Sequence, residues 1–110
     1  MVKMMALLYK RPDISEEEFY RYWKEIHAPL VAKLPLKVAR YVQNRVVKMP
    51  GIDPDLLGIA EIWYGGADSF EEVLAWRNTD EAKHLMEIEE SFVDKSRVLF
   101  CAVEEDIIVE

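Results

Sequence analysis

The stretch VARYVQNRVVKMPGIDPDLLGIAEIWY, residues 38–64, decides the fold of this chain. Residues 38–49 are rich in Val and Tyr with polar residues between them, a pattern that predicts a strand. A loop that contains Pro50, Gly51 and Pro54 follows, and residues 58–64 predict a second strand, which ends at Gly65-Gly66. The chain therefore makes two strands here with no helix between them.

A helix and a strand precede this pair. Ser15, with Glu18 three residues later, forms a capping box, which marks the start of a helix. Pro29 is expected to kink or end this helix near Ala28, because proline has no backbone N–H to donate. Residues 2–9 are apolar and predict the first strand. The helix carries apolar residues at helical spacing: Phe19, Trp23, Ile26 and Leu30.

The same order follows on the C-terminal side. Ser69 repeats the cap signature, so a second helix is expected to begin there. The pattern allows this helix to break at Asn78-Thr79 and to restart with Thr79 as its cap. The helix is then expected to continue to about Phe92. Residues 97–109 predict a last strand, with a possible bend at residues 104–106.

The element order is strand, helix, strand, strand, helix, strand. This order predicts an α+β, ferredoxin-like βαββαβ fold over residues 1–110 as a single domain, with one antiparallel four-stranded sheet and both helices on one face. Neither of the two strands predicted at residues 38–49 and 58–64 has a cleanly polar face, which favours a sheet covered on both sides. A second copy is the simplest cover, so we expect a homodimer in which two sheets pack into an α/β barrel.

The amino-acid composition limits which classes of partner this chain can bind. The chain has 14 Lys and Arg against 21 Asp and Glu, a net charge of −7, which argues against nucleic-acid binding. No apolar run exceeds the stretch from Met4 to Tyr9, and no signal peptide is visible, so we expect no membrane span and a cytoplasmic protein. The single cysteine, Cys101, excludes an intramolecular disulfide framework and is interpreted as a small core residue rather than a nucleophile.

One basic segment stands out against the acidic total. No Asp or Glu lies between Glu25 and Asp53. This segment would attract an anionic ligand or pair with acidic residues of a partner chain. Its basic residues are Lys33, Lys37, Arg40, Arg45 and Lys48.

His27 is the main catalytic candidate. It follows Trp23 by four residues on the same helical face, and imidazole is the usual proton shuttle near neutral pH. The alternative is that His27 caps the C-terminus of the helix. Glu61, in the middle of a strand, is the expected partner that orients the ring. The alternative for Glu61 is a salt bridge with Arg40 or Arg45.

Four further residues are expected to bind substrate. Trp23, Tyr41 and Trp63 are aromatics able to line an apolar pocket, although ordinary core packing explains them as well. Asn44 supplies a hydrogen-bond donor for a bound carbonyl, or simply lies on a solvated strand face. No glycine-rich nucleotide motif occurs, and the two histidines lack a carboxylate spacing that suits a metal. We therefore expect no cofactor and no metal.

The chain resembles the EthD family of dimeric α/β-barrel proteins. The likeness covers residues 10–30, KRPDISEEEFYRYWKEIHAPL, and continues through RYVQN at 40–44 and GIAEIWY at 58–64. It covers about two thirds of the chain and implies the same ferredoxin-like dimer. The second helix and the last strand match only in type.

The resemblance also indicates a class of substrate. The family takes its name from the degradation of ethyl tert-butyl ether, where such a protein accompanies an oxidative system. Similar barrels include cofactor-free quinol monooxygenases, muconolactone isomerases and polyketide cyclases. The resemblance thus implies a possible oxidoreductase or isomerase that acts on a hydrophobic or aromatic metabolite by proton abstraction. A non-catalytic metabolite-binding protein, or an accessory to an oxygenase, is the alternative.

Overall fold

A single antiparallel sheet organises the computed structural model of residues 1–110. Its strands are β1 (Val2–Tyr9), β2 (Val38–Arg45), β3 (Leu56–Tyr64) and β4 (Leu99–Val103), in the spatial order β2-β3-β1-β4. All three neighbouring pairs are antiparallel. This order is the one that two interlocked βαβ units produce, so the predicted α+β, ferredoxin-like fold is confirmed.

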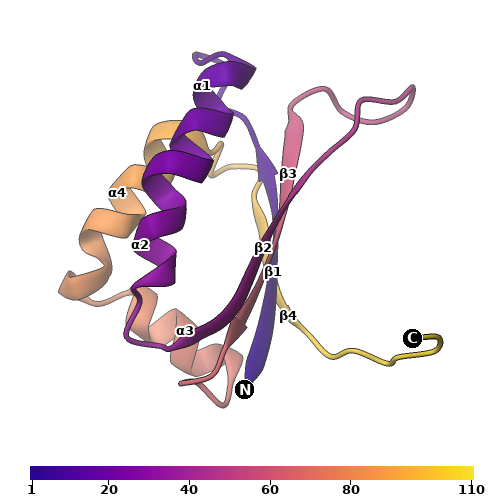
Figure 1. Ribbon diagram of the computed structural model, residues 1–110. Coiled ribbons are helices and arrows are strands. Elements are labelled where there is room, and N and C mark those ends of the chain that lie inside the picture. The colour runs from indigo at the N-terminus through magenta and orange to yellow at the C-terminus, as the bar shows by residue number, and fades with distance from the viewer.

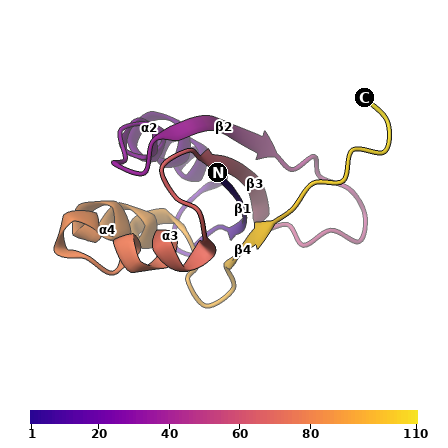
Figure 2. The same ribbon diagram turned by 90° about the horizontal axis from the view of Figure 1, so that it is seen from below.

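The helices cover one face of the sheet, and the other face is bare (Figures 1 and 2). The first helical segment consists of α1 (Glu16–Arg21), η1 (Tyr22–His27) and α2 (Ala28–Ala32). The second consists of α3 (Phe70–Arg77), η2 (Asp80–Ala82) and α4 (Lys83–Phe92). No helix is both long enough and apolar enough to cross a membrane.

Side-chain caps set both helix starts. The Ser15 hydroxyl accepts from the Glu18 amide, and the Glu18 carboxylate accepts from the Ser15 amide, so the predicted capping box is present. Ser69 likewise accepts from the Glu72 amide at the start of α3. Thr79 does precede η2, but its hydroxyl donates to the Trp76 carbonyl and makes no cap hydrogen bond.

The first helix does not end at Pro29. The chain changes to a π-helical turn in η1, where the Ala28 amide bonds to the Trp23 carbonyl five residues back. It then continues as α2 to Ala32. Because the helix runs past His27, the interpretation of His27 as a C-terminal cap is wrong. Single π-helical turns of this kind occur often at functional sites.

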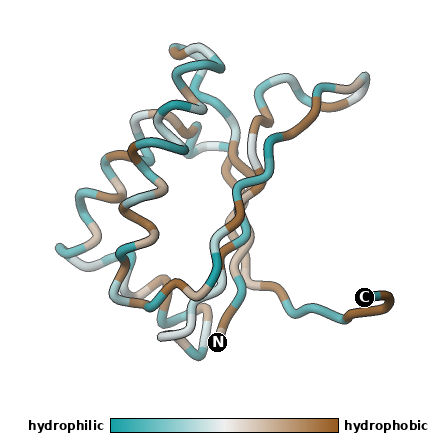
Figure 3. Tube along the Cα trace, in the orientation of Figure 1, coloured by the Kyte–Doolittle hydropathy of each residue, from teal (hydrophilic) through white to brown (hydrophobic).

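Two strands are shorter than expected. β4 stops at Val103 because Val103 pairs with Lys3 and β1 begins one residue earlier, so no partner strand lies beyond. Residues 104–110 leave the sheet as an extended tail (Figure 1). The apolar end of this tail is visible in Figure 3, and Ile108 and Val109 are almost fully exposed. β2 stops at Arg45 rather than at Met49.

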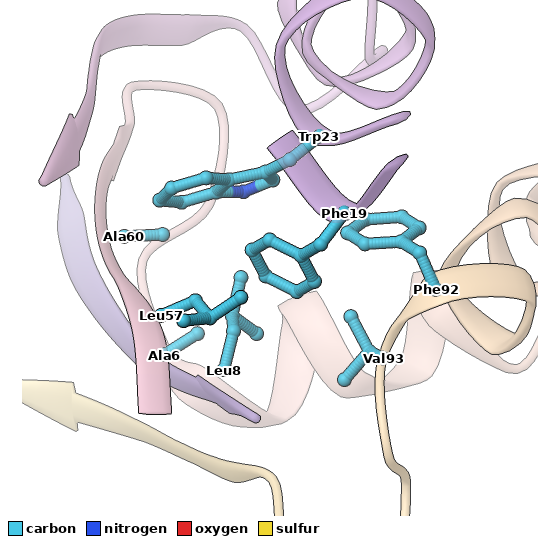
Figure 4. Close-up of a cluster of buried hydrophobic side chains, with 8 residues drawn as sticks. All are labelled: Ala6, Leu8, Phe19, Trp23, Leu57, Ala60, Phe92 and Val93. Carbon is cyan, nitrogen blue, oxygen red and sulfur yellow. The ribbon is translucent and has the colours of Figure 1, made fainter. Parts of the chain in front are cut away.

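The core lies between the helices and the inner face of the sheet, the face toward the helices. Strand alternation places Ala60, Ile62 and Tyr64 of β3 on that inner face, where all three are buried. The Trp23 indole extends toward β3, with the end of its ring near Ala60 (Figure 4). Gly58 allows this contact, since a Cβ there would lie 2.5 Å from the indole ring.

Candidate functional site

A buried histidine–glutamate pair joins the two helical segments. Nε2 of His27, at the end of η1, lies 2.9 Å from Oε2 of Glu89 in α4. Only 6% of His27 and 8% of Glu89 is exposed. They are the only polar or charged residues in the buried set. A charged group in such a position needs strong partners, because burial removes its hydration.

Two cations complete the set of partners for Glu89. Nη2 of Arg77, the last residue of α3, donates to Oε1 at 2.7 Å. Nζ of Lys95, just beyond α4, donates to the same oxygen at 2.7 Å. Glu89 and its three partners, His27, Arg77 and Lys95, are called the Glu89 cluster below. It gathers residues from both helical segments and the loop before β4.

The ionised carboxylate of Glu89 decides which ring nitrogen of His27 carries the hydrogen between them. Burial by itself would raise the pKa of Glu89, but the hydrogen bond from His27 and the charge of Arg77 outweigh it and hold that pKa well below its usual range. Glu89 is therefore a carboxylate at neutral pH and accepts a hydrogen bond, so Nε2 of His27 carries the hydrogen. In the neutral ring, Nδ1 then has a free lone pair, and this buried atom has no hydrogen-bond partner.

A cavity of about 70 Å³ adjoins this cluster between the helices and the inner sheet face. Its lining is mostly apolar and includes Trp23 and Phe100. Its volume is about half that of a cavity known to hold benzene, roughly 150 Å³. It therefore has room for the reacting end of a small molecule, and the remainder must extend outward. The polar lining residues are His27, Tyr41, Tyr64, Arg77, Glu89 and Lys95.

Two tyrosine hydroxyls of the cavity are neutral donors. Burial raises the pKa of Tyr41 to about 12 and that of Tyr64 to about 12, so both stay protonated at neutral pH. The Gln43 amide donates to the Tyr41 hydroxyl at 2.9 Å and to the Trp23 carbonyl at 3.0 Å. Because Tyr41 is the acceptor in that bond, its own hydrogen is free for a ligand oxygen.

Three of the predicted site residues meet at the cavity: His27, Trp23 and Tyr41. The expected pairing of Glu61 with His27 is wrong. Glu61 lies on the outer sheet face, away from the helices, because its neighbours Ala60 and Ile62 point inward. It bonds there to Nδ2 of Asn44 at 3.0 Å and to Nζ of Lys3 at 3.0 Å. The Asn44 hydrogen bond and the lysine charge lower the pKa of Glu61.

Trp63 and Asn44 lie on the same outer face and do not reach the cavity. The Trp63 indole donates to Glu105 at 3.2 Å. Lys3 and Arg40 stand over its ring at 4.5 and 4.7 Å from the ring centroid. The alternative prediction, a salt bridge of Glu61 with Arg40 or Arg45, is also wrong, since Glu61 forms its ion pair with Lys3.

The basic side chains of residues 33–48 lie away from the cavity as well. None of these lysines and arginines lines the cavity. Arg45 stacks on the Tyr20 ring at 4.0 Å, and Lys48 forms an ion pair with Glu16 of the same chain. Cys101 is half-buried on β4. No three His, Cys, Asp or Glu side chains gather closely enough to hold a metal ion.

The sequence interpretation missed Glu89. A signal was present, because Glu89 lies four residues after Leu85 and three before Phe92, both buried, and so falls on the apolar stripe of α4. An acid on an apolar stripe marks a buried charge that needs partners. Arg77 and Lys95 carried no comparable signal.

With this geometry established, comparison with known proteins identifies the family. The EthD domain matches residues 11–96. The chain belongs to the EthD family. An ethyl tert-butyl ether degradation (EthD) family protein from Bacillus halodurans has a similar structure, with 24% sequence identity and a TM-score of 0.69 over 96% of this chain and 100% of that one.

Two further solved structures share the fold. A protein from Arabidopsis thaliana has 16% identity and a TM-score of 0.70 over the whole of both chains. A protein from Bacteroides fragilis, described as dimeric, ferredoxin-like and of unknown function, has 18% identity and a TM-score of 0.63 over 94% of this chain and 95% of that one. Comparison with curated proteins found no match.

Proposed function

We propose that this EthD-family protein is a cofactor-free enzyme that removes a proton next to a carbonyl group of a small hydrophobic or aromatic metabolite. One observation carries the proposal. His27 has one ring nitrogen bound to an ionised Glu89, while the other is unpartnered and its ring lines a mostly apolar cavity. A general base needs such a free lone pair at a site that excludes water.

Each cavity residue has a role in this reaction. Nδ1 of His27 takes the proton from carbon, and the C–H electron pair forms the carbon–carbon double bond of an enolate. Glu89 is a positioning residue, which holds the tautomer and stabilises the imidazolium that forms. The free hydroxyl hydrogen of Tyr41 hydrogen-bonds to the developing oxyanion. Trp23 forms an apolar wall.

This proton abstraction is the shared first step of several reactions. Isomerisation, dehydration and cyclisation all continue from the enolate, and so does cofactor-free oxygenation, in which O₂ is the oxidant. The proposal therefore covers both the oxidoreductase and the isomerase or cyclase class. A cytoplasmic location belongs to the proposal and rests on the sequence alone.

Hydrogen exchange in D₂O tests the proposal without knowledge of the natural substrate. Aryl alkyl ketones, with propiophenone as the simplest, are followed by NMR for loss of the proton next to the carbonyl. The wild-type protein is expected to accelerate exchange on at least one ketone, and His27→Ala is expected to abolish the acceleration. The matched control is His84→Ala, since His84 is exposed on α4. Exchange at the same rate in His27→Ala would contradict the assigned base, and no acceleration by wild type would contradict the reaction.

We also propose that the protein is a homodimer whose two sheets pack through their outer faces. The helices leave this face bare, and it carries apolar residues such as Ile59 and Leu99 beside the polar pair of Glu61 and Asn44. Two solved structures with this fold are described as dimeric. In this arrangement Trp63, Asn44 and Glu61 serve the interface rather than the cavity.

A further inference from the structure

The Glu89 cluster contains more positive than negative charge. Its single carboxylate faces two full cations, Arg77 and Lys95, besides the hydrogen-bonded ring of His27. Neither cation has an ion pair with any other residue. Asp94, the acidic residue next to Lys95 in the sequence, pairs with Arg97 instead. Arg77 and Lys95 against the one carboxylate of Glu89 thus leave a surplus of one positive charge, with His27 not counted.

Hydrogen-bond donors are in surplus too. An arginine has five N–H donors and a lysine three. Arg77 and Lys95 together direct three of them at Glu89. The guanidinium of Arg77 is held in place by the Phe100 ring, 4.8 Å from its centroid. Donors thus remain for a second anionic group, which a planar guanidinium and an ammonium bind well.

The surplus charge lies where the cavity meets solvent. The side chain of Lys95 is 37% exposed and that of Arg77 19% exposed, whereas His27 is almost fully buried. All three line the same cavity. Of the three, Lys95 is the most exposed and His27 the most deeply buried. The rest of the cavity lining is mostly apolar.

We infer that the ligand of this cavity is a small apolar or aromatic molecule with a single negative charge, a carboxylate or a comparable oxyanion, which Arg77 and Lys95 bind. The inference rests on the proposed function in that it names the substrate class of the same cavity. It also assigns substrate recognition to Arg77 and Lys95 in place of the basic segment at residues 33–48. An anionic ligand would supply the counter-ion that this surplus charge lacks, whereas a neutral ligand would not.

A pair of probes that differ only in charge tests the inference. Phenylacetate and phenylacetamide have nearly the same shape, and only the first is an anion. Binding is measured by NMR titration, with the indole N–H of Trp23 as reporter, because Trp23 lines the cavity and its indole nitrogen has no hydrogen-bond partner. Wild type is expected to bind phenylacetate about tenfold more tightly than phenylacetamide. Raising NaCl from about 20 mM to about 500 mM is expected to reduce that preference.

Two lysine variants test whether Lys95 causes the preference for phenylacetate over phenylacetamide. Lys95→Met keeps the apolar stem and removes the charge, and it is expected to lose most of the preference while the affinity for phenylacetamide changes by less than about twofold. Lys83→Met is the matched control, because Lys83 is exposed on α4 and does not line the cavity.

Three outcomes would overturn the inference: equal affinity for the two probes, an unchanged preference in Lys95→Met, or no response of the Trp23 signal to either probe. Neither probe is turned over in this assay. Failure of the proposed catalysis in the exchange experiment is therefore distinguishable from failure of anion recognition here.

Discussion

Replacement of Glu89 by Gln tests the central interaction of the candidate site. Glutamine keeps the shape of the side chain and one oxygen acceptor but removes the charge that Arg77 and Lys95 share. Removing one partner of a buried ion pair costs about 3–5 kcal/mol, and the retained acceptor favours the lower end. Lys95, whose side chain is 37% exposed, adds only about 0.2–1 kcal/mol, because solvent screens it. The expected loss in unfolding free energy is therefore about 3–4 kcal/mol.

Urea and thermal denaturation followed by circular dichroism measure this loss. A loss of about 3–4 kcal/mol lowers the Tm of a domain of this size by roughly 12–16 °C. A small domain has about 5–15 kcal/mol in total, so the variant should still fold at low temperature. Glu90→Gln is the control, because Glu90 is the next residue on α4 and is exposed. It is expected to change stability by less than about 0.5 kcal/mol.

The pH dependence gives an independent check. The pKa of Glu89 is lowered in the folded state, chiefly because the His27 hydrogen bond and the Arg77 charge overcome the effect of burial. The stabilisation is thus present above the pKa of the unfolded chain, about 4.3, and is lost as the pH falls through the folded value. The contribution of the Glu89 charge to the difference between wild type and Glu89→Gln should therefore shrink below about pH 4. A difference under about 1 kcal/mol at pH 7, or one that persists undiminished at about pH 3, would refute the reasoning.

Three further predictions follow from the fold and the site. Gly58→Ala is expected to lower stability by about 1–3 kcal/mol in urea denaturation, because its Cβ would meet the Trp23 ring at 2.5 Å; an unchanged midpoint would contradict this close packing. Tyr41→Phe is expected to slow the ketone exchange reaction about a hundredfold while the fold persists; exchange at the wild-type rate would remove the hydroxyl from the mechanism. Light scattering at micromolar concentration should give twice the chain mass of 12.9 kDa, and a single-chain mass would rule out the homodimer.

The helix starts are the part of the fold that local chemistry settles. Ser15 and Glu18 form their capping box within four residues, and Ser69 caps α3 in the same local way. Such hydrogen bonds depend on nearest neighbours only, so a sequence pattern predicts them well. The effect of Pro29 was not local, because the π-helical turn in η1 lets the helix continue to Ala32.

The buried histidine–glutamate pair shows the opposite case. His27 was recognised from its position on a helical stripe, but its partner lies 62 residues away in α4. A carboxylate in the middle of a strand predicts a partner for Glu61, but the pleat of β3 directs Glu61 to the outer face, away from His27. Which face of a strand points inward is a property of the whole sheet.

By itself, the sequence determined the element order, the helix starts, the ferredoxin-like topology and the candidate His27. These follow from hydrogen bonds, hydrophobic spacing and chain connectivity, which are readable along the chain. Only the tertiary structure decided that Glu89, and not Glu61, holds His27, and that Arg77 and Lys95 converge on the same carboxylate. Those contacts arise when two helical segments pack on one sheet face. Packing brings distant charges together, because buried charges must find partners away from water.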